Sequence, residues 1–177
     1  MKTITKSYDI NKDAVLALKN KFGKIHCQNW DKNTIAIEVE ITVEASSQEK
    51  AEKYFDKIKI DFSGTSSRVS ATTNFDDNMF KNNKGEISVD YMVSMPASIG
   101  VEIDHKFGDL ILESVEGNSS IEVGYGSLEA KKLMGDENDL EIKFSEGYVG
   151  YVKNADLEVK YGEMEIDEAL SLSAESK

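Results

Sequence analysis

The segment IDHKFGDLIL, residues 103–112, holds an aromatic–glycine pair, Phe107-Gly108, between apolar residues at alternate positions. The same arrangement occurs five times along the chain. The five pairs are Phe22-Gly23, Phe107-Gly108, Tyr125-Gly126, Phe144-Ser145 and Tyr161-Gly162. The last four pairs follow one another at intervals of 18, 19 and 17 residues. A period of this length indicates that one short structural unit is stacked on itself.

The residues around each pair align in columns when the aromatic residue is counted as position zero. Position −4 holds Leu18, Ile103, Ile121, Leu140 and Leu157; position +3 holds Ile25, Leu110, Leu128, Gly147 and Met164; position +5 holds Cys27, Leu112, Ala130, Val149 and Ile166; position +8 holds Trp30, Val115, Leu133, Val152 and Ala169. Short-range alternation of apolar and polar residues is typical of strands. Position +8 breaks the alternation, which indicates a corner between strands.

A unit of 17–19 residues is too small to bury its own apolar face, so it must stack on its neighbours. We therefore predict an all-β chain folded as a parallel β-helix (β-solenoid) with rungs of 17–19 residues. Equivalent side chains would then lie about 4.8 Å apart and form ladders, an aromatic one at position zero and aliphatic ones at +3 and +5. The small residue after each aromatic would form a tight bend. Ser145 departs from this rule, and the nearby Gly147 indicates that the bend there has shifted.

The chain is predicted to be a single domain over residues 1–177. It has a first rung at 15–43, an insertion at 44–100 and stacked rungs at 101–177, the last of them incomplete. In that last rung, Leu170, Leu172 and Ala174 continue the columns at −4, −2 and 0.

The insertion has its own local signals. Ser46 and Glu49 make a capping box, and a short amphipathic helix at 47–57 is predicted to follow. Strands are predicted at 58–62, 68–72 and 87–95, with a turn through Ser63-Gly64 and a loop at 73–85. We expect this helix and hairpin to cap the N-terminal end of the solenoid, because solenoids need their open ends covered.

Charge is distributed unevenly along the 177 residues, whose net charge is −12. Residues 1–101 carry 14 acidic and 14 basic side chains, whereas residues 102–177 carry 19 acidic and 7 basic ones. Nucleic acid and anionic lipid are therefore disfavoured as partners, because both need clustered Lys and Arg. No run of 18 apolar residues exists, so we expect no membrane span, and the N-terminus shows no signal peptide. The single Cys27 excludes an internal disulfide.

One polar column stands out in the stacked rungs. Position −3 holds Asp104, Glu122, Glu141 and Glu158, and position −1 holds Lys106, Gly124, Lys143 and Lys160. Stacked carboxylates can share Ca²⁺. They can equally form a solvated face that the lysines partly neutralise, and we favour this second interpretation because no calcium-loop motif is present. We predict no metal and no cofactor.

Few residues have chemistry that would suit a reactive site. His26 falls at an outward position and His105 beside the aromatic ladder, and neither has a ligand cluster at metal-binding spacing. Cys27 and Trp30 occupy core columns, so we interpret both as buried packing residues. Asn118-Ser119-Ser120 matches a glycosylation acceptor, a weak motif when it stands alone. We predict no catalytic, cofactor-binding or metal-binding residue.

Several runs of the chain resemble a bacterial family of β-solenoid domains known as putative adhesins. The runs are LKNKFGKI (18–25), WDKN (30–33), DYMVSMP (90–96), KFGDL (106–110), FSE (144–146) and YGE (161–163). The resemblance covers nearly the whole chain and implies a β-helix in an exported protein, in the periplasm or at the cell surface. It supplies no catalytic residue.

Two classes of function follow, with a third in reserve. The first is a non-catalytic surface or cell-envelope protein, an adhesin-like scaffold that binds a protein or a glycan. The second is an architectural spacer that self-associates through its open C-terminal edge. The third is a carbohydrate-active β-helix enzyme, which we disfavour because no insertion within 107–169 is large enough to wall a cleft.

Overall fold

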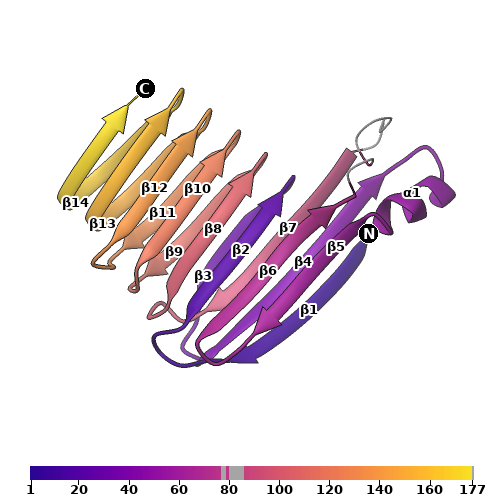
Figure 1. Ribbon diagram of the computed structural model, residues 1–177, viewed down its shortest axis with the longest axis horizontal. Helices are drawn as coiled ribbons and strands as arrows, with labels where there is room; N and C mark the ends of the chain where they lie inside the picture. Colours follow the sequence, from indigo (N-terminus) through magenta and orange to yellow (C-terminus); the bar gives the residue numbers. More distant parts are fainter. Residues whose placement is uncertain (77–78, 80–85, 177) are drawn as a thin grey trace.

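The computed structural model describes residues 1–76, 79 and 86–176, which form one sheet of 14 strands and one helix, α1 (Gln48–Phe55) (Figure 1). The strands are β1 (Lys2–Asp9), β2 (Val15–Lys21), β3 (Ile25–Asn29), β4 (Thr34–Glu44), β5 (Ile58–Gly64), β6 (Arg68–Phe75), β7 (Glu86–Met95), β8 (Gly100–Lys106), β9 (Asp109–Val115), β10 (Ser119–Gly124), β11 (Ser127–Leu133), β12 (Asn138–Lys143), β13 (Glu146–Lys160) and β14 (Glu163–Ser176).

The sheet folds over on itself at β13. Hydrogen bonds connect the strands in the order β1-β4-β7-β3-β9-β11-β13-β12-β10-β8-β2-β6-β5, and β14 lies on β13. The first half of β13 pairs with β11 and its second half pairs with β12. Two layers therefore face each other across one core, and the sheet is nearly closed, like a barrel (Figure 1).

The predicted parallel β-helix is wrong as a description of this fold. The sheet has mixed orientation, because β4 runs antiparallel to both β1 and β7, and β5 runs antiparallel to β6. The predicted cap is wrong too, since the insertion adds strands to the sheet: β7 lies between β3 and β4, and β6 lies beside β2. Helix α1 packs against β4 and has no buried residue. The columns in the sequence identify which residues are neighbours across parallel strands. They contain no information about which strands pair antiparallel.

The helix and strands predicted in the insertion are present, but their ends differ by a few residues from the predicted ones. The helix begins one residue late, because Ser47 rather than Ser46 is the N-cap and accepts a hydrogen bond from the backbone N–H of Lys50. Strand β5 continues through Gly64, where a turn was expected. Strand β6 takes in residues 73–75 of the predicted loop, whose positions 77–78 and 80–85 lie outside the described residues.

Residues of one sequence column are paired across neighbouring strands in the second half of the chain. Ile121 lies between Ile103 and Leu140, and Leu128 lies beside Leu110. These side chains are buried and form the core between the layers. The register expected for the last strand is wrong, because Leu157 pairs with Ala174 and not with Leu170.

The corner after each of β2, β8, β10, β12 and β13 has an unusual backbone. Positive φ falls on the aromatic residue at all five corners, whereas of the glycines expected to make the bends only Gly23 has a positive φ, 131°. The angles are 62° at Phe22, 61° at Phe107, 58° at Tyr125, 50° at Phe144 and 52° at Tyr161. The bend at Phe144 has therefore not shifted, contrary to prediction.

Close stacking of the backbone explains the small residue that follows. A Cβ on Gly108 would overlap the carbonyl oxygen of Gly23, and a Cβ on Gly126 would overlap that of Gly108. Ser145 replaces this glycine at one corner, and its hydroxyl accepts a hydrogen bond from the Gly126 N–H at 3.1 Å. A small residue is needed after each aromatic because the backbones of successive turns are in contact. The periodicity of the sequence shows the small residue but not this reason for it.

Polar groups are buried where β2 and β8 meet the inserted strands. The Asn20 side chain donates to the Val89 carbonyl oxygen at 2.8 Å, and Thr73 donates to Asn20 at 2.8 Å. His105 is fully buried, with its Nε2 lying 3.0 Å from the Gly23 carbonyl oxygen and its Nδ1 without a hydrogen-bond partner among the described residues. Burial lowers the pKa of His105 below its usual 6.5.

His105 should therefore make stability pH-dependent. The folded chain holds the imidazole neutral, while the unfolded chain takes up a proton below pH 6.5, so stability is full above that pH and falls below it. The loss is at most about 1.4 kcal/mol per pH unit. The matched variant is His105→Val, because Val123 is its pairing partner in the neighbouring strand. Denaturant unfolding at pH 7.5 and 5.5 should show the loss in the wild type only, and equal losses in both proteins would contradict this role.

Candidate binding surface

Five aromatic rings form a ladder along the corner that connects the two layers. Neighbouring ring centroids lie 5.0–5.1 Å apart and the ring planes are within 13° of parallel. The rings belong to Phe22, Phe107, Tyr125, Phe144 and Tyr161, so the predicted aromatic ladder is confirmed. Phe75 closes one end of this aromatic ladder with an edge-to-face contact to Phe22 at 5.6 Å.

The aromatic ladder is largely open to solvent beyond Phe22. Exposed fractions are 44% for Phe107, 52% for Tyr125, 49% for Phe144 and 73% for Tyr161. Stacking covers the ring faces, so the surface consists mainly of ring edges and the outer face of Tyr161. Contiguous apolar surface of this kind often marks an interaction site.

A second ladder, of alternating charges, lies beside the aromatic one on the layer that contains β8, β10 and β12. The ammonium groups of Lys106, Lys143 and Lys160 each lie between two carboxylates of adjacent strands, and Lys19 contacts Asp104 at one end. The contacts are Lys19–Asp104 2.7 Å, Lys106–Asp104 3.7 Å, Lys106–Glu122 3.4 Å, Lys143–Glu122 3.2 Å, Lys143–Glu141 2.9 Å, Lys160–Glu141 3.0 Å and Lys160–Glu158 2.8 Å. This ionic ladder supports the solvated-face interpretation, because lysines occupy the space that a shared cation would need.

Ion pairing in this ladder shifts the pKa values of Lys19, Glu141, Lys143 and Lys160. Hydrogen bonds from Lys143 lower the pKa of Glu141, and hydrogen bonding to Glu141 raises the pKa of Lys143. The charged forms of these four groups are thus favoured. The same ion pairs hold the lysines, so little free positive charge faces the aromatic ladder.

Glu141→Gln should destabilise the fold by about 1 kcal/mol at low salt, because Glu141 contacts two ammonium groups in a network. Most of that loss should disappear in 1 M NaCl, where the Debye length is about 3 Å. The control is Asp139→Asn on the same strand and face, a carboxylate without an ion pair in the described part of the chain. Denaturant unfolding measures both; equal effects of the two variants would show that the ladder contributes nothing specific.

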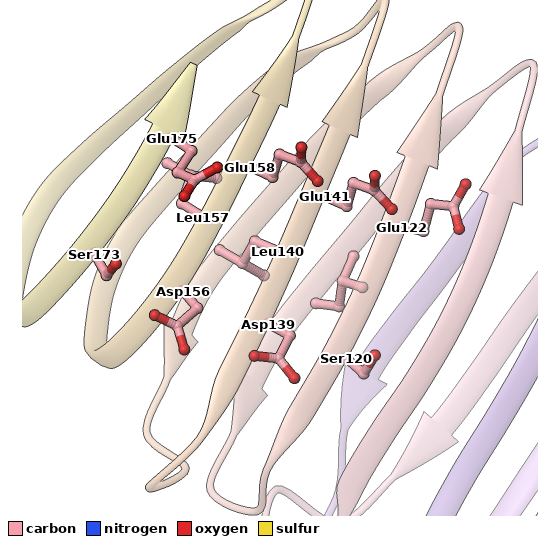
Figure 2. Close-up of a pocket in the computed structure, with 11 residues that line it drawn as sticks. Ser120, Glu122, Asp139, Leu140, Glu141, Asp156, Leu157, Glu158, Ser173 and Glu175 are labelled. Carbon is pink, nitrogen blue, oxygen red and sulfur yellow. The ribbon is translucent and has the colours of Figure 1, made fainter. Parts of the chain in front are cut away.

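A shallow groove of about 470 Å³ lies on this acidic face (Figure 2). Figure 2 shows two rows of polar side chains crossing β10, β12, β13 and β14, with apolar side chains such as Leu140 and Leu157 between them. The upper row is Glu122, Glu141, Glu158 and Glu175, and the lower row is Ser120, Asp139, Asp156 and Ser173. The lower row was not recognised in the sequence, although its register with the upper row, two residues along each strand, would have revealed it. The described residues contain no group of three or more side chains suited to hold a metal ion.

The other residues singled out in the sequence lie apart from both ladders. The exception is His105 on β8, whose ring contacts the Gly23 carbonyl oxygen at the corner after β2. Cys27 is buried as predicted, and burial raises the pKa of its thiol to about 12, which keeps it an unreactive thiol. Trp30 is only half-buried, so its assignment to the core is wrong; its indole N–H donates to the Thr34 carbonyl oxygen at 2.8 Å. His26 is half-buried beside Glu38 and Asp90. Asn118 is exposed on the turn between β9 and β10.

Four carboxyl groups among the described residues have a shifted pKa. A catalytic acid usually needs a raised pKa. Among the described carboxyl groups, those with a shifted pKa all shift downwards, and each is paired with a cation. They are Glu102 with Arg68, Glu113 with Lys131, Asp136 with Lys153, and Glu141 with Lys143.

No protein-family model matches the sequence, and no curated protein matches it. Solved structures do resemble the chain. A putative adhesin from Bacteroides fragilis has a TM-score of 0.51 and 13% identity, over 99% of this chain and 77% of that one. A putative cell adhesion protein from Clostridium sporogenes has a TM-score of 0.45 and 11% identity, over 99% and 100% of the two chains. A putative adhesin from Parabacteroides distasonis has a TM-score of 0.45 and 9% identity, over 99% and 78%.

The similarity to the first structure is a similarity of fold. At 13% identity it assigns no role to any residue of either ladder. Within residues 1–76, 79 and 86–176, no helix is long and apolar enough to cross a membrane.

Proposed function

We propose that this chain is a non-catalytic binding scaffold of the bacterial cell surface or envelope, with the aromatic ladder as its contact surface. One observation carries the proposal: four stacked rings, each between 44% and 73% exposed, form a continuous apolar strip on a strongly acidic domain. A soluble domain rarely exposes such a strip without a partner.

The charges beside the aromatic ladder indicate what kind of partner it accepts. Three carboxylates follow the rings along the chain, those of Asp109, Glu146 and Glu163, and the last two form no ion pair among the described residues. The neighbouring lysines Lys143 and Lys160 are held by the ionic ladder. A neutral or cationic ligand is therefore favoured over an anionic one.

The location outside the cytoplasm rests on two supports. The sequence resembles a family of exported domains, and the Bacteroides fragilis protein of similar fold is described as a putative adhesin. A glycan or a surface protein is the class of partner that such a location offers.

The experiment is a binding screen with the purified chain on immobilised glycans and envelope proteins, at physiological salt. Retention by at least one neutral or cationic ligand class is the expected result. Retention only by polyanions, or by nothing on the array, would contradict the proposal.

Absence of catalysis is part of the same proposal. It is supported by carboxyl groups that are ion-paired and lowered in pKa rather than raised. Incubation with a panel of bacterial and plant polysaccharides should release no new reducing ends. Time-dependent release that a carboxylate variant abolishes would instead establish a carbohydrate-active enzyme.

A further inference from the structure

Strand β5 is an edge strand in the interior of the chain. It ends the order of strands in one layer and pairs with β6 alone among the described strands. Both its ends continue into other elements, α1 before it and β6 after it, so this edge is not an end of the chain. The ring of Tyr8 in β1 lies against Gly64 and closes one end of the edge, which leaves residues 58–62 free. A free edge can pair with another strand.

Backbone hydrogen bonds identify which residues of β5 face this free edge. The Asp76 N–H donates to the Lys57 carbonyl oxygen at 3.0 Å, and the Thr65 N–H donates to the Arg68 carbonyl oxygen at 2.8 Å. Positions 57 and 65 therefore direct their backbone groups toward β6. The direction alternates along an antiparallel strand, so the odd-numbered residues between them do the same. The backbone groups left for the free edge belong to Ile58, Ile60 and Phe62.

The side chains of β5 are divided between two faces. Ile58 is buried, and Ile60 and Phe62 are half-buried against the core. Lys59 and Asp61 are exposed on the outer face, and neither forms an ion pair within the described part of the chain. A further strand would cover the half-buried apolar side chains and could supply a partner for each charge.

The neighbouring edge strand, β1, is protected against such pairing. Lys2 and Lys6 of β1 pair with Ile41 and Ile37, two buried residues of β4, so both lysines lie on the core-facing side. Inward-pointing charges on an edge strand oppose the addition of a further strand. The core-facing side of β5 carries no charge over its free residues, so β5 is the edge that can accept a partner.

We propose that two copies of this chain pair antiparallel through β5, with Ile60 at the two-fold axis. Ile60 then faces Ile60 of the second copy, and Ile58 faces Phe62. These edge-facing residues exchange backbone hydrogen bonds. On the outer face Lys59 of each copy faces Asp61 of the other, so the pairing brings opposite charges together twice. No ring of the aromatic ladder is used, so this proposal is independent of the proposed function.

Charge selects this register over its neighbours. A pair centred on Lys59 would set two lysines directly opposite each other, and a pair centred on Asp61 would do the same with two aspartates. Like charges at opposed positions are destabilising. Only the register centred on Ile60 pairs all of residues 58–62 with one another and sets both charges against their opposites. The sequence of this short strand is therefore complementary to itself.

Sedimentation equilibrium of the wild type between about 10 µM and 1 mM tests the association, because one pair of strands is a small interface and binds weakly. A monomer–dimer equilibrium is the expected result. Lys59→Asp gathers four carboxylates at the interface, and Asp61→Lys gathers four ammonium groups, so each should weaken the dimer about tenfold or more. Lys132→Asp makes the first of these charge changes at an exposed position of β11 and should leave the dimer unchanged.

Two combinations test the register itself. Lys59→Asp/Asp61→Lys in one chain exchanges the two charges, so opposite charges face each other again and the dimer should return. Mixing the two single variants should give a heterodimer, because each supplies the charges that the other lacks. Far-UV circular dichroism checks that every variant is folded.

A wild type that is still monomeric at about 1 mM would overturn the proposal. Assemblies larger than a dimer would overturn it too, since they require pairing through another edge. The same holds if the single charge variants dimerise like the wild type, or if the exchanged double variant does not recover the dimer.

Discussion

Gly126→Ala is expected to destabilise the fold by about 3 kcal/mol or more, a loss at the upper end for single substitutions. The added Cβ would overlap the backbone of Gly108 in the preceding turn, where no flexible side chain can move aside. Relief would require the two turns to separate. That separation would also pull apart the rings of Tyr125 and Phe107, which stack at 5.0 Å.

Gly124→Ala is the control, two residues earlier in the chain, at the end of β10. A Cβ there would meet Lys106 Cγ at 3.6 Å, an ordinary contact. Stability should stay the same or rise by about 0.5 kcal/mol, because alanine loses less entropy on folding than glycine. Urea unfolding compares the two variants. If Gly126→Ala were as stable as Gly124→Ala, the close contact between turns would be disproved.

Leu112→Ala should cost about 2–5 kcal/mol, the range for large-to-small changes in a core. Leu112 is 1% exposed, and its neighbours across the strands are Cys27 and Ala130, both smaller side chains. Alanine at this place would put three small residues side by side. Little side-chain volume would then be available to fill the cavity, so the cost should lie in the upper part of the range.

Met134→Ala provides the comparison for a side chain outside the core. Met134 is 43% exposed, and its truncation should change stability by less than about 0.5 kcal/mol. Chemical unfolding of both variants at one protein concentration gives the difference directly. Similar losses for the two would mean that the space between the layers is not the tightly packed core described for residues such as Leu112.

The columns of the sequence predicted neighbours better than they predicted the fold. They placed Phe107, Tyr125 and Phe144 in one ladder, and the rings do stack. This part was predictable because parallel pairing at a constant offset brings like residues together. The column argument failed at Leu170, where it assumed an offset of 13 residues instead of the observed 17.

The antiparallel parts of the sheet could not be read from the same columns. Strand β1 was missed because only Ile4 and Tyr8 of its residues are partly buried, so its alternation is weak. Strand β4 alternates clearly, but alternation is the same for parallel and antiparallel strands. Its antiparallel pairing with β7 depends on residues more than 40 positions away, and it is one of the pairings that give the sheet its mixed orientation.

The residues that form the candidate surface could be predicted from the sequence, but the contacts between their side chains could not. The acidic column at Glu122, Glu141 and Glu158 was visible, and so were the lysines beside it. Which lysine bridges which pair of strands depends on side-chain conformation, which spacing does not determine. The positive φ of Tyr125 was also hidden, because glycine next to it offered the simpler explanation for a bend.

The most direct test of the aromatic ladder as a binding surface compares the wild type with Tyr125→Asn/Phe144→Asn on one glycan and protein array. Asparagine tolerates positive φ, so the corners should keep their shape while the apolar strip is interrupted. Glu129→Asn, an exposed change on β11, serves as the control. We predict at least a tenfold loss of binding, about 1.4 kcal/mol, for the double variant and none for the control. Equal binding by the wild type and a correctly folded double variant would contradict the account.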